Sequence, residues 1–147
     1  MTVTVDIQGA EQVYVKLKNF DNAVRISLKK AMDLAMIDLS ATIKQKLSGG
    51  VLNVRTGTLR RSITQQINED NSGVTGVAGT NIKYAAIHEY GGQVKTRLGT
   101  GKNPPKPGGK AYATMPERSY LRSSLKDKQD QIRQRLANAV GEATHGN

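Results

Sequence analysis

The sequence predicts a single α+β domain over residues 1–147, with a small antiparallel sheet and two helices packed on one face of it. Three observations lead to this prediction. Apolar residues recur at helical spacing in two long segments, 21–47 and 118–143. They alternate with polar residues in a segment at the start of the chain and in two segments that flank a turn. A chain of 147 residues is also long enough to bury one hydrophobic core.

The chain begins with a pattern typical of a strand. Val3, Val5 and Ile7 alternate with polar residues, which predicts a half-buried strand over 2–8. Residues 10–20 have apolar side chains at helical spacing and fit a short helix, although the β-branched residues there would also suit a strand.

The segment 21–47 shows the clearest helical pattern of the chain. Asp21 or Asn22 can cap its start by accepting hydrogen bonds from the free amides of the first turn. The glycines in Ser48-Gly49-Gly50 favour an end to the helix at that point.

This long helix has more apolar surface than one core face needs. Ile26, Met36 and Ile37 lie off the main apolar stripe. Two explanations are open. A sheet or loop could wrap further round the helix, or these side chains could contact a second subunit.

The middle of the chain predicts a hairpin and a short helix. Two alternating segments flank the turn-forming residues 69–73, so we expect a β-hairpin over 62–80. Asn81 can cap a short helix over 82–90, and Gly91 and Gly92 end it.

Residues 91–111 differ in kind from the rest and predict a protruding arm. The segment holds six glycines, three of the four prolines, and five cations with no acid: Lys95, Arg97, Lys102, Lys106 and Lys110. We expect 93–98 and 110–114 to pair as a long hairpin with a basic loop at its tip, 99–109. Such an arm would meet either DNA phosphates or an acidic protein surface.

The last helix is predicted over 118–143, with a frayed tail at 144–147. Thr114 and Glu117 have the spacing of a capping box, in which each side chain accepts a hydrogen bond from the other residue's amide. Charges of both signs lie between the apolar positions, which is typical of a solvated helix face.

Charge and composition limit the function further. Twenty-two Lys and Arg against 12 Asp and Glu give a formal net charge of +10, which indicates a polyanionic or acidic partner. Because there is no cysteine, and only His88 and His145 are present, we expect no disulfide, metal site or cofactor. Since no apolar run is long enough for a membrane span or a secretory signal, we expect a protein of the cytoplasm.

Catalytic chemistry has little support. His88 and Glu89 could supply a general base, but neighbouring residues on a helix point about 100° apart and do not form a dyad. We therefore expect His88 to pack against Tyr84 or the following loop. Three arginines near the glycine turn could clamp an anion, form salt bridges between subunits or be solvated: Arg55, Arg60 and Arg61.

Three short motifs follow one another along the chain. The first is a turn in 55–63 that contains Thr56, Gly57 and Leu59. The second is a helix in 84–91 that contains Tyr84, His88, Glu89, Tyr90 and Gly91. The third, in 115–122, leads into the last helix and contains Tyr120 and Leu121. In this order the motifs resemble the tail-completion, or neck, proteins of long-tailed bacteriophages, over roughly residues 20–140. The chain departs from that family at Ser119, where proline is usual.

The resemblance implies a structural virion protein rather than an enzyme. Such proteins form a ring, most often of six copies, at the head–tail junction, and they join the tail to the head connector while DNA passes through the ring. It implies assembly in the host cytoplasm, neighbouring neck and tail proteins as partners, and no membrane. Two alternatives remain: a free basic nucleic-acid-binding protein, or an enzyme with a cleft around His88.

Overall fold

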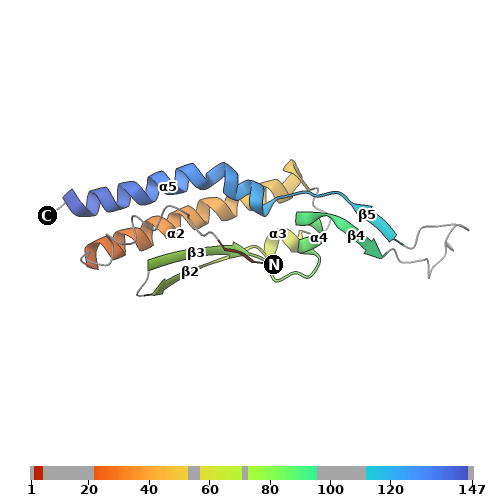
Figure 1. Ribbon diagram of the computed structural model, residues 1–147, viewed down its shortest axis with the longest axis horizontal. Coiled ribbons are helices and arrows are strands. Elements are labelled where there is room, and N and C mark those ends of the chain that lie inside the picture. The colour runs from red at the N-terminus through yellow and green to blue at the C-terminus, as the bar shows by residue number, and fades with distance from the viewer. Residues whose placement is uncertain (1, 5–21, 53–56, 71–72, 96–111, 146–147) are drawn as a thin grey trace, which may run out of the picture.

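The computed structural model describes residues 2–4, 22–52, 57–70, 73–95 and 112–145, and it confirms the α+β fold (Figure 1). The elements are β1 (Thr2–Thr4), α2 (Asn22–Gln45), α3 (Thr58–Arg61), β2 (Thr64–Asp70), β3 (Gly73–Gly79), α4 (Ala85–Tyr90), β4 (Gly92–Lys95), β5 (Tyr112–Met115) and α5 (Leu121–His145). The helix expected over 10–20 and the loop expected over 99–109 lie outside the described residues.

The main sheet has three antiparallel strands in the order β1-β3-β2. β2 and β3 form the predicted hairpin, with Thr64 opposite Gly79 and Asp70 opposite Gly73. β1 pairs with the other edge of β3, which confirms the first predicted strand over Thr2–Thr4.

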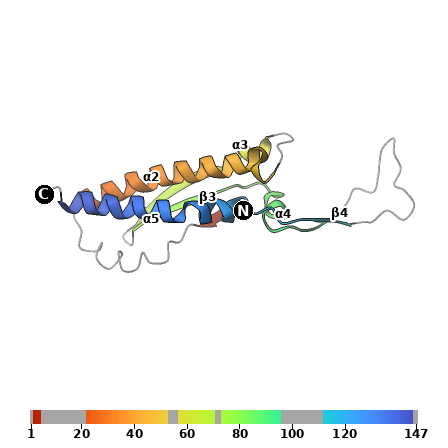
Figure 2. The same cartoon turned by 90° about the horizontal axis from the view of Figure 1, so that it is seen from above.

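Both long helices lie on the same side of this sheet. α2 packs directly against β2 and β3, and α5 packs along α2 (Figures 1 and 2). Side chains from all of these elements form one core, to which α2 contributes Met32, Ala35, Met36, Leu39 and Ile43. Other members of the core come from β3, from α5, from the residues next to β2 and α5, and from the chain after Gln45: Ile63, Ala78, Tyr120, Leu121, Ile132, Leu47 and Leu52. Burial of this apolar surface is the main force that holds the fold together.

A glycine lets the sheet approach α2 closely. A Cβ atom built on Gly76 would lie 2.7 Å from Met36 Sδ and 3.0 Å from Met32 Sδ. The absence of a side chain on Gly76 therefore makes room for two methionines of α2.

The end of α2 agrees with the glycine signal in the sequence. The chain continues beyond Gln45 into a last turn over Lys46–Gly50, where Ser48 and Gly49 leave helical geometry. Gly49 has a φ of 120°, a value that favours glycine over other residues.

A second, two-stranded sheet projects from one end of the molecule (Figures 1 and 2). β4 pairs with β5, with Gly92 opposite Met115 and Lys95 opposite Tyr112. This pairing confirms the predicted arm over its described part. Arg97, Lys102, Lys106 and Lys110 lie outside the described residues.

Candidate functional site

The junction between α4 and the start of α5 is built around one buried carboxylate. Glu89 lies on the last turn of α4 and is 0% exposed. Its two oxygens accept five hydrogen bonds from the first residues of α5 and the residues just before it. The donors are Ser119 Oγ (3.0 Å), the backbone N–H groups of Tyr120 (2.8 Å), Leu121 (2.8 Å) and Arg122 (2.9 Å), and Arg122 Nε (3.1 Å).

Glu89 therefore caps α5 from a different helix. The first amides of a helix have no partner within it, and a negative charge there also meets the positive end of the helix dipole. The predicted capping box of Thr114 and Glu117 is wrong, because Thr114 lies in β5 and α5 begins only at Leu121. Glu117 instead pairs with Arg122 Nη2 at 2.6 Å.

The electrostatics of Glu89 follow from these contacts. Burial alone would raise the pKa of the carboxyl, but the N–H groups of Leu121 and Arg122, the Ser119 hydroxyl and the Tyr120 N–H together hold it below its usual value. Glu89 is thus ionised at neutral pH. Its charge is balanced by Arg122 and by the start of α5.

Arg122 ties the outer side of the junction together. Its guanidinium carbon lies 4.6 Å from the centre of the Tyr90 ring, a stacking geometry in which the cation faces the π system. It also bonds Glu89 and Glu117. The guanidinium is therefore fixed on three sides.

Gly91 allows the two segments to meet. Its φ is +69°, and a Cβ atom there would lie 2.6 Å from the Glu117 backbone nitrogen and 2.8 Å from the Met115 carbonyl oxygen. The Arg118 N–H donates to the His88 carbonyl oxygen at 2.9 Å. The second and third sequence motifs are thus two sides of one structural contact.

His88 does not form a catalytic pair with Glu89, whose side chain is turned toward α5. Its ring stands at 88° to that of Tyr84, with centres 5.9 Å apart, as the spacing of these two residues predicts. Burial, and then the charge of Arg118, lower the pKa of His88. His88 is therefore neutral at pH 7, and its Nδ1 atom is buried without a hydrogen-bond partner.

The first motif shapes the turn before β2. Gly57 adopts a left-handed conformation (φ 68°) at the start of α3, and Leu59 packs against the core. Arg60 and Arg61 are exposed on α3. Arg55 and Thr56 lie outside the described residues.

The outer face of α2 presents an exposed apolar stripe. Ile26 is 56% exposed, Leu34 55% and Ile37 51%. Met36 is 0% exposed, so the expectation that it contacts another subunit is wrong: Gly76 brings β3 over it. Leu34 is not among the interface residues predicted above, although positions 26, 30, 34 and 37 follow helical spacing on one face.

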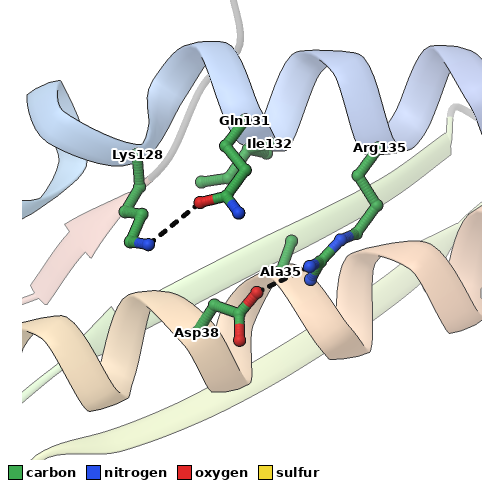
Figure 3. Close-up of a pocket in the computed structure, with 6 residues that line it drawn as sticks. All are labelled: Ala35, Asp38, Lys128, Gln131, Ile132 and Arg135. Atoms are coloured by element: carbon green, nitrogen blue, oxygen red, sulfur yellow. Dashed lines mark hydrogen bonds and ion pairs between the residues drawn. The ribbon is translucent and has the colours of Figure 1, made fainter.

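A shallow depression between α2 and α5 is lined by polar side chains, one pair of which joins the two helices (Figure 3). Arg135 pairs with Asp38 at 2.7 Å, and Lys128 donates to Gln131 at 2.9 Å. Within the described ranges no group of three His, Asp or Glu side chains could hold a metal ion. No helix in those ranges is long and apolar enough to span a membrane.

The fold and the junction define a small α+β protein in which the buried Glu89 carboxylate joins α4 to the start of α5. Residues 38–141 match the model of the phage virion morphogenesis family. Since this match spans more than half of the chain, the protein belongs to that family and takes part in building the phage particle. Comparison with curated proteins and with solved structures found no significant match.

Proposed function

We propose that the protein is a structural subunit of the phage neck, at the junction of head and tail. It forms a ring, most simply of six copies, that completes the tail or joins it to the head connector, and the genome passes through this ring. The family supports a role in virion assembly. The observation that carries the finer proposal is the exposed apolar stripe on α2.

The stripe is suited to contact a neighbouring subunit. Ile26, Leu34 and Ile37 are each about half exposed on a helix whose opposite face is already in the core. An apolar stripe of this kind typically marks an interface. When it meets a different surface of the next copy, the contact is heterologous, and repetition by rotation closes a ring. Arg60 and Arg61, exposed on α3, would supply polar contacts at the rim of this interface.

The projecting β4–β5 hairpin supports contacts beyond the ring. A two-stranded hairpin alone is marginally stable in water. Lys95 and Tyr112, which face each other across it, are both exposed. We propose that this arm contacts neighbouring neck or tail proteins, and that any contact with the genome is non-specific.

The proposed role is structural and not catalytic. The carboxylate that the sequence places beside His88 is fully engaged in capping α5, so it is not available to orient the imidazole as a base. His88 instead helps to hold α4 against the following segment through its carbonyl oxygen.

The subunit interface can be tested with a charge placed in the stripe. We expect Ile26→Asp with Ile37→Asp to abolish ring formation, because two carboxylates would be buried without partners. Gln129→Asp with Gln134→Asp, at exposed positions of α5, adds the same charge and serves as the control. Sedimentation velocity and negative-stain microscopy would report oligomer size, and circular dichroism would report folding. Rings of normal size from the Ile26/Ile37 variant would refute the proposed interface.

A further inference from the structure

The positive charge of the chain is concentrated in two segments. Residues 55–61 and 83–122 hold 11 of the 22 Lys and Arg residues but only two of the 12 acids, Glu89 and Glu117. The rest of the chain is nearly neutral. The net charge of +10 is thus a local feature of these segments rather than a property of the whole surface.

The described cations of these segments lie at one end of the molecule. α3, α4, the β4–β5 hairpin and the start of α5 gather at the end of the long axis opposite the C-terminus (Figures 1 and 2). We call this the basic end and define it by Arg60, Arg61, Lys83, Lys95, Arg118 and Arg122.

Ion pairing differs between the basic end and the remainder. Away from this end, Lys29 pairs with Glu69 (3.1 Å) and Arg135 pairs with Asp38 (2.7 Å), in each case across two elements. At the basic end, Arg122 pairs with Glu89 and with Glu117. Lys83 and Lys95 are exposed and make no ion pair within the described part of the chain. Their charge is therefore available to a partner.

Exposed tyrosines gather at the same end. Tyr84 is 45% exposed, Tyr90 54% and Tyr112 54%, and they come from α4, the residue before it, and β5. Tyrosine and arginine are the residues most often found at the energetic centres of protein–protein interfaces. Arg122 is already held against Tyr90, so little side-chain freedom would be lost when a partner covers this pair.

We propose that the basic end is a docking site for an acidic face of a different protein in the phage particle. This inference rests on the proposed role in the neck and names the chemistry of the partner. Charge complementarity of this kind raises the rate of encounter and fixes orientation. The exposed tyrosines would supply the apolar contact area at the centre of the interface.

One feature favours a protein over DNA as the partner. The start of α5, which could otherwise bind a phosphate, is already closed by the carboxylate of Glu89.

The test uses a carbodiimide, which joins lysine amines to carboxylates in direct contact. Intact particles of the phage that encodes this chain are treated, digested and analysed by mass spectrometry. We expect Lys83 or Lys95 to be linked to Asp or Glu of another virion protein. We also expect Lys83→Gln with Lys95→Gln to lower incorporation of the protein into particles at least several-fold. Lys126→Gln with Lys128→Gln on α5 removes the same charge and should leave incorporation unchanged.

The outcomes separate this inference from the proposed function. If particles contain the protein at the neck but Lys83 and Lys95 form no link to another virion protein, the inference is overturned while the neck assignment stands. Links from these lysines only to other copies of this chain, or only to DNA after formaldehyde treatment, overturn it as well. Particles that lack the protein altogether would refute the neck assignment, and this inference with it.

Discussion

Replacement of Glu89 by glutamine tests whether the cap on α5 holds the molecule together. The amide has the same shape but no charge, and one of its two ends is an NH2 donor. Every group that contacts the two carboxylate oxygens of Glu89 is an N–H or O–H donor. The NH2 group of Gln would therefore face another donor in either orientation of the amide. The buried Tyr120 and Leu121 amides would lose their charged acceptor.

These contacts determine how much stability the Glu89→Gln variant should lose. Each buried donor left without a partner costs about 1–3 kcal/mol, and removal of one partner of a buried ion pair costs about 3–5 kcal/mol in all. Because Arg122 is half exposed and can regain water, we expect Glu89→Gln to lower the free energy of unfolding by about 2–4 kcal/mol. Glu117→Gln removes only an exposed ion pair of the same arginine and should cost less than about 1 kcal/mol.

Urea unfolding followed by circular dichroism measures both variants against the natural chain. A Glu89→Gln variant as stable as the Glu117→Gln variant would show that the Glu89 cap contributes little to the stability of the fold. If the Glu89→Gln variant does not fold, Ser119→Ala takes its place in the experiment. This change removes one hydrogen-bond donor to Glu89 and leaves the charge of the carboxylate in place.

The remaining predictions concern pH and close packing. Since the folded protein holds the pKa of Glu89 below its usual value, its stabilising effect is complete above the unfolded pKa, about 4.3, and is lost as pH falls through the lower folded value. The urea concentration at the unfolding midpoint should fall between pH 6 and pH 3 as this stabilisation is lost. The fall should be smaller for the Glu89→Gln variant. Gly91→Ala should lower stability by more than about 2 kcal/mol in the same assay, because a positive φ and a backbone contact of 2.6 Å both oppose a Cβ atom; an unchanged midpoint would contradict this. Gly76→Ala should cost about 1–3 kcal/mol, since the added methyl group overpacks the core beside Met36. A neutral or stabilising effect would mean that the methionine shifts freely.

Much of the fold follows from local patterns in the sequence. The periodicity of 21–47 predicts α2, and the alternation on either side of 69–73 predicts the β2–β3 hairpin. The pairing of β4 with β5 also follows from the sequence, because the Gly- and Pro-rich segment between them favours a connecting loop. These features depend on residues close together in the chain, so a single sequence is sufficient to find them.

Contacts between residues far apart in the chain could not be predicted from such local patterns. Glu89 caps a helix that begins more than 30 residues later, and the rules for helix starts consider only neighbouring residues. Met36 lies off the apolar stripe of α2, but the missing side chain of Gly76 brings β3 over it. The second and third motifs indicated part of this contact, since the glutamate and glycine at the end of α4 lie against the entry to α5.

Electron cryomicroscopy of the intact particle would show directly whether this chain forms a ring at the phage neck. We expect a closed ring of density at the head–tail junction that fits this fold. We also expect the α2 residues Ile26, Leu34 and Ile37 to lie at the boundary between adjacent subunits. Density for the chain elsewhere in the particle would contradict a role in the neck, and a ring in which this face of α2 is exposed to solvent would contradict the proposed interface.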